Sequence, residues 1–248
     1  MNLNALNNFF FSALPYMALV VFLIGTIYRY QTTGFKFSSL SSQFLESRGL
    51  FWGVIPFHFG ILVVFLGHLL AFCFPKGQLL WNSQPIRLIL LEVTAFTFGV
   101  SVFIGLMALI VRRFTNPRIR VVTNVMDTVI EFLLLMQVIL GCWIALGYRW
   151  GSSWFAADLS PYLWSIFKLN PQIDAVSAMP WVIKLHVIGA FLIVLLIPFT
   201  RLIHFLVAPI PYIWRPYQKV IWNWDRKKIR LADEQWNHHS PRHRPRNN

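Results

Sequence analysis

Residues 50–74 read LFWGVIPFHFGILVVFLGHLLAFCF and contain no Asp, Glu, Lys or Arg. A helix needs ~20 predominantly apolar residues to cross the hydrocarbon core of a bilayer, so this stretch predicts a transmembrane helix. It also contains His58 and His68. An imidazole in hydrocarbon is costly unless it faces the protein interior and has a partner. The two histidines therefore need a common explanation.

The composition of the whole chain indicates an integral membrane protein. Its 248 residues are 56% hydrophobic and 12% charged, whereas soluble domains are about 25% charged. The net charge of +13 would suggest nucleic acid in a soluble chain. Here the positive charge lies in the loops and the tail, so we expect no nucleic-acid partner and a membrane-orientation signal instead. Cys73 and Cys142 fall in apolar stretches without metal-ligand spacing and are interpreted as small buried hydrophobes.

Five apolar stretches are long enough to cross a bilayer. They are Phe9–Ile27, Leu50–Phe74, Ile86–Val111, Val125–Tyr148 and Trp181–Ala208. The N-terminal residues MNLNALNN lack a basic region, and no small-residue cleavage site follows, so the first stretch is expected to remain as a span. The predicted fold is an all-α, five-helix transmembrane bundle.

Lys and Arg are distributed unevenly between the two sides of this bundle. Of the 22 in the chain, 17 fall on the side of the C-terminal tail and 5 on the opposite side. The positive-inside rule then predicts an external N-terminus and a cytoplasmic C-terminus. In the outer loop 149–180, Ser160 followed by Pro161 predicts the N-cap of a short helix on the membrane surface.

The chain is expected to divide into a transmembrane domain, residues 1–210, and a basic cytoplasmic tail, residues 211–248. In the tail, Trp222, Trp224 and Ile229 alternate with Lys and Arg. Two interpretations stay open for this region. It is either an interfacial basic segment with a disordered end or a docking surface for a cytoplasmic partner.

Four histidines lie inside predicted spans: His58 and His68 in the second, His186 and His204 in the fifth. These spans run antiparallel, so depth in the membrane pairs His58 with His204 and His68 with His186. Eighteen residues make a whole number of helical turns, which places His186 and His204 on one helix face. The rise between the paired levels is about 15 Å on the second span and about 27 Å on the fifth, a mismatch that helix tilt would have to absorb.

Two stacked pairs of imidazoles favour haem over other metal centres. Zinc needs three or four ligands converging at about 2 Å, and imidazoles about 15 Å apart along one helix cannot share an ion. Haem iron takes two axial ligands, one on each face. Two pairs then predict two haems stacked across the membrane as an electron path. The alternative is four core histidines that hydrogen-bond to backbone groups.

Glycines recur every seven residues in the second span, at Gly53, Gly60 and Gly67. Close helix packing is one interpretation of this spacing. For Gly67, which adjoins His68, the other is that it makes room for a porphyrin edge or a ligand.

Four stretches carry a resemblance to a known family. They are FHFGILVVFLGH at 57–68, RRFTNPRIRVVT at 112–123, YRWGSSWFA at 148–156 and KLHVIGAFLIVLLIPFTRLIHFLVAPIPYIWRPYQ at 184–218. With the five-span layout, they make the chain resemble, to about residue 224, the gamma subunit of membrane-bound respiratory nitrate reductase, a di-haem cytochrome b.

The resemblance implies that His58 and His204 ligate a haem b near the cytoplasm, and His68 and His186 a distal haem b. It implies a quinol:nitrate oxidoreductase subunit in the bacterial cytoplasmic (inner) membrane that serves anaerobic respiration and has no catalytic side chain of its own. Quinol is oxidised near the distal haem. Electrons then pass to a cytoplasmic iron–sulfur beta subunit and a molybdenum-containing alpha subunit.

The quinol site is expected at Gly67 and Arg87. Better-known family members have a lysine at the start of the third span, where this chain has Leu88, and Arg87 is the nearest cation. Two other functions stay open. One is the same cytochrome serving a related molybdenum enzyme, such as one that oxidises nitrite, and the other is a non-redox membrane scaffold or metal transporter.

Other polar residues near the spans have two interpretations. Glu92 either accepts protons or forms an interhelical hydrogen bond. Asp127 and Glu131 are expected to pair with nearby arginines. Arg112, Arg113 and Arg201 either meet haem propionates or are ordinary positive-inside residues.

Overall fold

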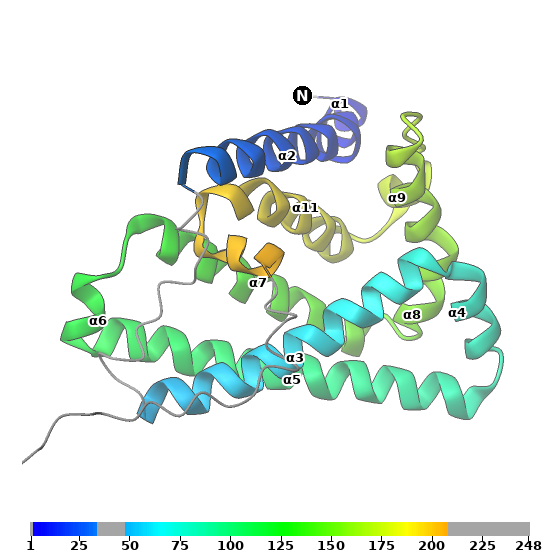
Figure 1. Ribbon diagram of the computed structural model, residues 1–248. Coiled ribbons are helices and arrows are strands. Elements are labelled where there is room, and N and C mark those ends of the chain that lie inside the picture. Colours follow the sequence, from blue (N-terminus) through cyan, green and yellow to red (C-terminus); the bar gives the residue numbers. More distant parts are fainter. Residues whose placement is uncertain (1, 34–47, 208–248) are drawn as a thin grey trace, which may run out of the picture. The chain divides into compact units, whose positions relative to one another are not determined.

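The computed structural model describes residues 2–33 and 48–207, and within these ranges the chain is helical and contains no β-strand (Figure 1). Five helices are long and apolar enough to cross a membrane: Leu3–Thr32, Leu50–Cys73, Pro85–Thr115, Val125–Gly147 and Trp181–Phe199. These confirm the five predicted spans. The tail and most of the loop 31–49 lie outside the described residues. The division into domains and the orientation therefore stay predictions.

The first span combines α1 (Leu3–Asn8), a π-helical turn (Phe9–Ala13) and α2 (Leu14–Thr33). The histidine-bearing second span is α3 (Arg48–Cys73). It is followed by α4 (Pro75–Asn82), α5 (Pro85–Thr115), α6 (Pro117–Val121) and α7 (Val125–Gly147). Helices α4, α5 and α6 each begin at a proline, which the first turn tolerates because its N–H groups have no partner within the helix.

The segment between α7 and the last span is also helical. It contains α8 (Gly151–Trp154), a π-helical turn (Phe155–Leu159), α9 (Ser160–Phe167) and α10 (Asp174–Ala178). Helix α9 confirms the predicted short helix, but Ser160 is not its N-cap. The chain enters α9 directly from the π-helical turn, so the Ser160 hydroxyl is free to donate to the Ala71 carbonyl of α3, at 3.0 Å.

The long helices contact one another in a fixed order. Helix α3 packs along α5, α5 also contacts α7, α7 contacts α11 (Trp181–Leu196), and α11 contacts α2 (Figure 1). Helices α3 and α11, which carry three of the four membrane histidines, are therefore joined mainly through α5 and α7. Helices α3 and α11 themselves do not pack along each other.

Glycines allow the close approach of α3 and α5. A Cβ added at Gly60 would lie 2.7 Å from a Val102 side-chain carbon, and one added at Gly105 of α5 would lie 2.8 Å from the Gly53 carbonyl oxygen. The packing interpretation is thus confirmed for Gly53 and Gly60. It is not supported for Gly67, where an added Cβ would have no atom of the described residues within 4 Å. The glycines of the seven-residue repeat therefore lie in two different environments: Gly53 and Gly60 contact α5, and Gly67 does not.

The fifth span is not one continuous helix. Helix α11 ends at Leu196, and a 3₁₀ turn (Ile197–Phe199) follows. Thr200 is extended, with φ −118° and ψ 176°, and a second 3₁₀ helix (Arg201–Val207) begins after it. The predicted helix to Ala208 is wrong because Pro198 has no N–H to continue the α-helical hydrogen bonds.

This break corrects the geometry expected for His186 and His204. The two residues do not share a helix, so the count of whole turns between them no longer applies, and neither does the rise of about 27 Å. A side chain from the first span stabilises the broken segment. Arg29 Nη1 of α2 donates to the carbonyl oxygens of Pro198, at 2.6 Å, and Thr200, at 3.0 Å.

Candidate functional site

The two histidines expected nearer the cytoplasm lie next to each other. His58 comes from α3 and His204 from the 3₁₀ helix Arg201–Val207, and their ring centroids are 6.3 Å apart with an interplanar angle of 57°. A ligating nitrogen lies about 2 Å from a metal ion, and roughly 1.1 Å from the centroid of its own ring. Two imidazoles on opposite sides of one ion therefore have centroids about 6 Å apart. The observed separation matches this value.

Three of the four membrane histidines have one ring nitrogen fixed by a backbone carbonyl. The Nδ1 atom lies 2.9 Å from the Val54 oxygen in His58, 2.8 Å from the Val64 oxygen in His68, and 2.6 Å from the Arg201 oxygen in His204. A carbonyl oxygen only accepts, so Nδ1 carries the proton and Nε2 keeps its lone pair. This is the state in which a histidine binds a metal.

The interpretation of four satisfied core histidines does not fit α3. Both His58 and His68 are exposed in the structure, although they lie on a membrane-spanning helix. Helix α3 uses Gly53 and Gly60 against α5 and leaves its histidines uncovered by the described protein. An imidazole facing hydrocarbon is costly. A flat apolar cofactor ligated by Nε2 would cover these rings.

The second pair joins α3 to α11. His186 of α11 lies against α7 at a glycine, because a Cβ added at Gly141 would be 3.4 Å from its Cε1 atom. Its Nδ1 is buried and makes no regular hydrogen bond among the described residues, although the backbone of Gln137 lies close enough to the ring to interact with it. The His68 ring meets Phe155 edge to face, with centroids 5.5 Å apart.

A conventional metal cluster is not present in the described part of the chain: no group of three or more His, Cys, Asp or Glu residues is placed to hold an ion. Zinc sites need three or four such ligands. Haem iron needs only two axial ligands, because the macrocycle supplies the rest. The paired arrangement therefore fits haem. The 6.3 Å separation of the His58 and His204 ring centroids is compatible with one such group.

The two residues predicted for the quinol site have different environments. Gly67 directly precedes His68 in α3, and both residues are exposed in the described structure. We call this part of the helix the open face of α3. Arg87 lies in the first turn of α5, and its guanidinium carbon is 5.3 Å from the ring centroid of Trp81. The assignment of both to quinol stays a prediction.

Glu92 serves as a hydrogen-bonded interhelical carboxylate. Its Oε1 accepts from the backbone N–H of Ser152 at 2.8 Å and from the Ser152 hydroxyl at 2.6 Å. The same hydroxyl accepts from Asn82 Nδ2 at 3.0 Å. These contacts join α5 to α8 and α4. They favour the structural interpretation of Glu92 over the proton-accepting one.

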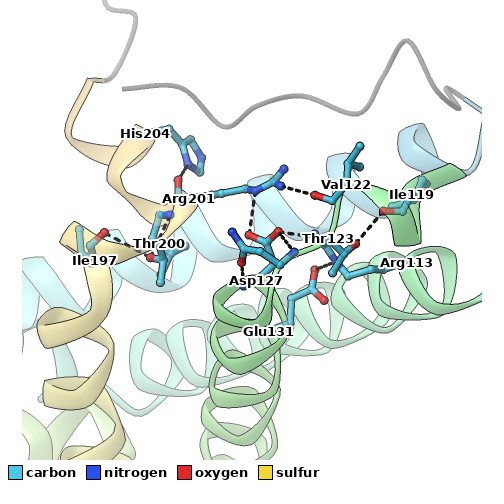
Figure 2. Close-up of polar contacts among 12 residues, drawn as sticks. Arg113, Ile119, Val122, Thr123, Asp127, Glu131, Ile197, Thr200, Arg201 and His204 are labelled. Carbon is cyan, nitrogen blue, oxygen red and sulfur yellow. Dashed lines mark hydrogen bonds and ion pairs between the residues drawn. The ribbon is translucent and has the colours of Figure 1, made fainter. Parts of the chain in front are cut away.

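An ion-paired cluster lies near His204 (Figure 2). Asp127, with a side chain that is 3% exposed, places Oδ1 2.8 Å from Arg201 Nε and Oδ2 3.5 Å from Arg113 Nη1. Arg113 Nε donates to Glu131 Oε1 at 2.6 Å. The expected pairing of Asp127 and Glu131 with arginines is confirmed. The sequence carried no signal that Asp127 reaches Arg201, three residues before His204.

The fold defines a protein with five helices that are long and apolar enough to cross a membrane, and it places His58 next to His204. The chain belongs to the nitrate reductase gamma subunit family, whose model matches residues 7–223. The family expected from the sequence motifs is thereby confirmed.

Individual relatives match over most of this chain. It is 33% identical over 219 residues to the respiratory nitrate reductase 2 gamma chain of Escherichia coli (strain K12), covering 87% of this chain and 96% of the relative. It is 30% identical over 208 residues to the nitrate reductase gamma chain of Bacillus subtilis (strain 168), covering 82% and 93%. It is also 32% identical to the nitrate reductase-like protein NarX of Mycobacterium tuberculosis (strain ATCC 25618 / H37Rv), but covers only 33% of that longer protein.

Proposed function

We propose that this chain is the membrane anchor and electron-transfer subunit of a respiratory nitrate reductase in the bacterial cytoplasmic membrane. It oxidises quinol on the outer side and transfers electrons through two bis-histidine haems b to a cytoplasmic iron–sulfur subunit. The iron–sulfur subunit then passes the electrons to a molybdenum-containing subunit, which reduces nitrate. The observation that carries the proposal is the His58–His204 pair, whose centroids are 6.3 Å apart and whose Nδ1 atoms both bond to carbonyls.

Each haem, when bound, supplies a one-electron carrier inside the membrane. His58 and His204 would hold one haem, and His68 and His186 would hold the other. In His58, His68 and His204, the Nδ1–H bonds to backbone carbonyls fix the orientation of the rings and raise the basicity of Nε2. The apolar helices around the histidines exclude water and thereby influence the reduction potential.

The proposed orientation explains how the protein conserves energy. With an external N-terminus, His68, Gly67 and Arg87 lie toward the outer leaflet, where quinol docks and releases its protons outside. Moving one elementary charge across 100 mV costs about 2.3 kcal/mol. Quinol oxidation outside and nitrate reduction inside would thus contribute to the membrane potential without a proton pump. The basic tail 211–248 would dock to the cytoplasmic partners.

The haem content of the purified wild-type complex tests this function directly. We expect reduced-minus-oxidised spectra to show two b-type haems per chain and a quinol analogue to reduce both. A complex without haem would reject the proposal and leave the paired histidines unexplained. A complex with two haems that quinol does not reduce would place the electron donor elsewhere.

The substitution Gly67→Leu tests the proposed use of the open face of α3. The fold should tolerate it, because among residues 2–33 and 48–207 no atom lies within 4 Å of a Cβ added at Gly67. A leucine there would occupy space beside His68, so we expect the rate of haem reduction by quinol to fall about tenfold, as for other changes next to a metal ligand.

The matched control for Gly67→Leu is Gly77→Leu. Gly77 is another loosely packed helical glycine, where an added Cβ would meet only Phe74, at 3.7 Å. Rapid-mixing spectroscopy should give the wild-type rate for this control. Equal rates in both variants would show that the space at Gly67 has no role in electron entry.

A further inference from the structure

The segment that carries His204 lacks the support of a regular α-helix. It lies in the 3₁₀ helix Arg201–Val207, which begins after the extended residue Thr200. The hydrogen bonds of 3₁₀ helices have poorer geometry than those of α-helices. The orientation of His204 must therefore depend on contacts made to other parts of the chain.

Arg201 makes those contacts through both its side chain and its main chain (Figure 2). Its Nε lies 2.8 Å from Asp127 Oδ1, and its Nη2 donates to the Val122 carbonyl at 3.0 Å. Its own carbonyl oxygen accepts from Nδ1 of His204 at 2.6 Å. One residue thus connects a carboxylate of α7 to the imidazole that faces His58.

Asp127 is held in place independently of Arg201. It forms a capping box at the start of α7, in which Oδ2 accepts from the Asn124 N–H at 3.2 Å and its own N–H donates to Asn124 Oδ1 at 2.8 Å. Oδ2 also lies 3.5 Å from Arg113 of α5. The carboxylate is 3% exposed. It is therefore a fixed charge against which Arg201 can be positioned.

We propose that Asp127 is a positioning residue for His204 that acts through Arg201. The ion pair holds the Arg201 backbone, and the Arg201 carbonyl oxygen holds the His204 ring through Nδ1, which leaves Nε2 available to a metal. The proposal rests on the proposed function, in which His204 is an axial haem ligand. Groups that hydrogen-bond directly to a metal ligand, as the Arg201 carbonyl does to His204, typically change metal affinity about 10- to 100-fold when they are removed. Asp127 lies one step further out, so the lower end of this range is expected.

Asp127→Asn separates this role from helix capping. Asparagine has nearly the same shape, and its amide oxygen can still accept from the Asn124 N–H, but it lacks the charge that holds Arg201. In the full membrane complex, we expect the haem of His58 and His204 to be lost to a haem-scavenging protein about tenfold faster than in the wild type. We also expect a changed low-spin EPR line for that haem alone.

The haem of His68 and His186 serves as an internal reference, and a variant lacking His68 assigns the EPR lines. Glu131→Gln is the matched control, because Glu131 lies one turn further along α7 and bonds to Arg113 at 2.6 Å. It should leave both haem signals unchanged. Asp127→Glu keeps the negative charge, so it should lose this haem more slowly than Asp127→Asn does.

Three results would overturn the inference. In the first, Asp127→Asn retains both haems with wild-type EPR lines and rates of loss. In the second, Asp127→Asn and Glu131→Gln affect both haems equally, which indicates general loosening. In the third, Asp127→Asn does not accumulate and Arg201→Gln, measured in its place, leaves the haem of His204 unchanged. A wild-type complex without haem would instead reject the proposed function itself.

Discussion

Replacing His68 with alanine is expected to remove one of the two haems and to abolish reduction of the complex by quinol. His68 Nδ1 is bonded to the Val64 carbonyl at 2.8 Å, so Nε2 is the nitrogen available to a metal. The methyl group of alanine cannot ligate iron, so the haem would lose one of its two axial ligands. Reduced-minus-oxidised spectra of purified complexes would show half of the wild-type b-type absorbance.

His68→Met is the matched control, because methionine keeps an axial ligand. Methionine–histidine ligation raises the reduction potential of haem. We therefore expect this variant to retain both haems, with one at a more positive potential in a redox titration. Retention of two unaltered haems by His68→Ala would contradict the assignment of His68. Loss of both haems would indicate that the two sites are not independent.

Gly105→Ala is expected to destabilise the protein strongly, although it adds only one methyl group. The added Cβ would lie 2.5 Å from the Phe57 amide nitrogen and 2.8 Å from the Gly53 carbonyl oxygen. Both are backbone atoms, so α3 and α5 would have to separate. Overpacking typically costs about 1–3 kcal/mol. We expect an effect at the upper end, measured as a lower thermal unfolding midpoint in detergent.

Gly99→Ala is the control in the same helix. A Cβ at Gly99 would meet Cys142 Sγ at 3.5 Å, an ordinary van der Waals contact. Both substitutions gain the same helix propensity, since alanine is favoured over glycine by about 1 kcal/mol in a helix interior. A stable Gly105→Ala variant would show that α3 and α5 do not need this close approach. His58, one residue from Phe57, should lose haem binding along with the interface.

Much of the site can be predicted from the sequence because membrane constraints act locally. A span shows as a long, predominantly apolar run, since a charge in hydrocarbon is costly whatever the rest of the fold. Histidines within such runs are therefore visible without knowledge of the fold. Two in α3 and one in α11, with His204 just beyond, were enough to indicate pairs. The motifs around them indicated the family.

The fifth span differs most from what its sequence predicted. Counting whole turns between His186 and His204 assumes one α-helix over residues 181–208, whereas Pro198 carries the signal for a break. The structure ends α11 at Leu196 and brings His204 to His58 from a 3₁₀ helix. Arg29, far away in the chain, bonds to the carbonyls at the break.

The sequence by itself determined the class of protein, the five spans and the candidate ligands, because each depends on the polarity of a short stretch. The tertiary structure decided which glycines touch a neighbour, as Gly53 and Gly60 do and Gly67 does not. It also decided that Asp127 meets Arg201 beside His204. These properties depend on atoms from different helices, and the distances between such atoms follow only from how the helices pack.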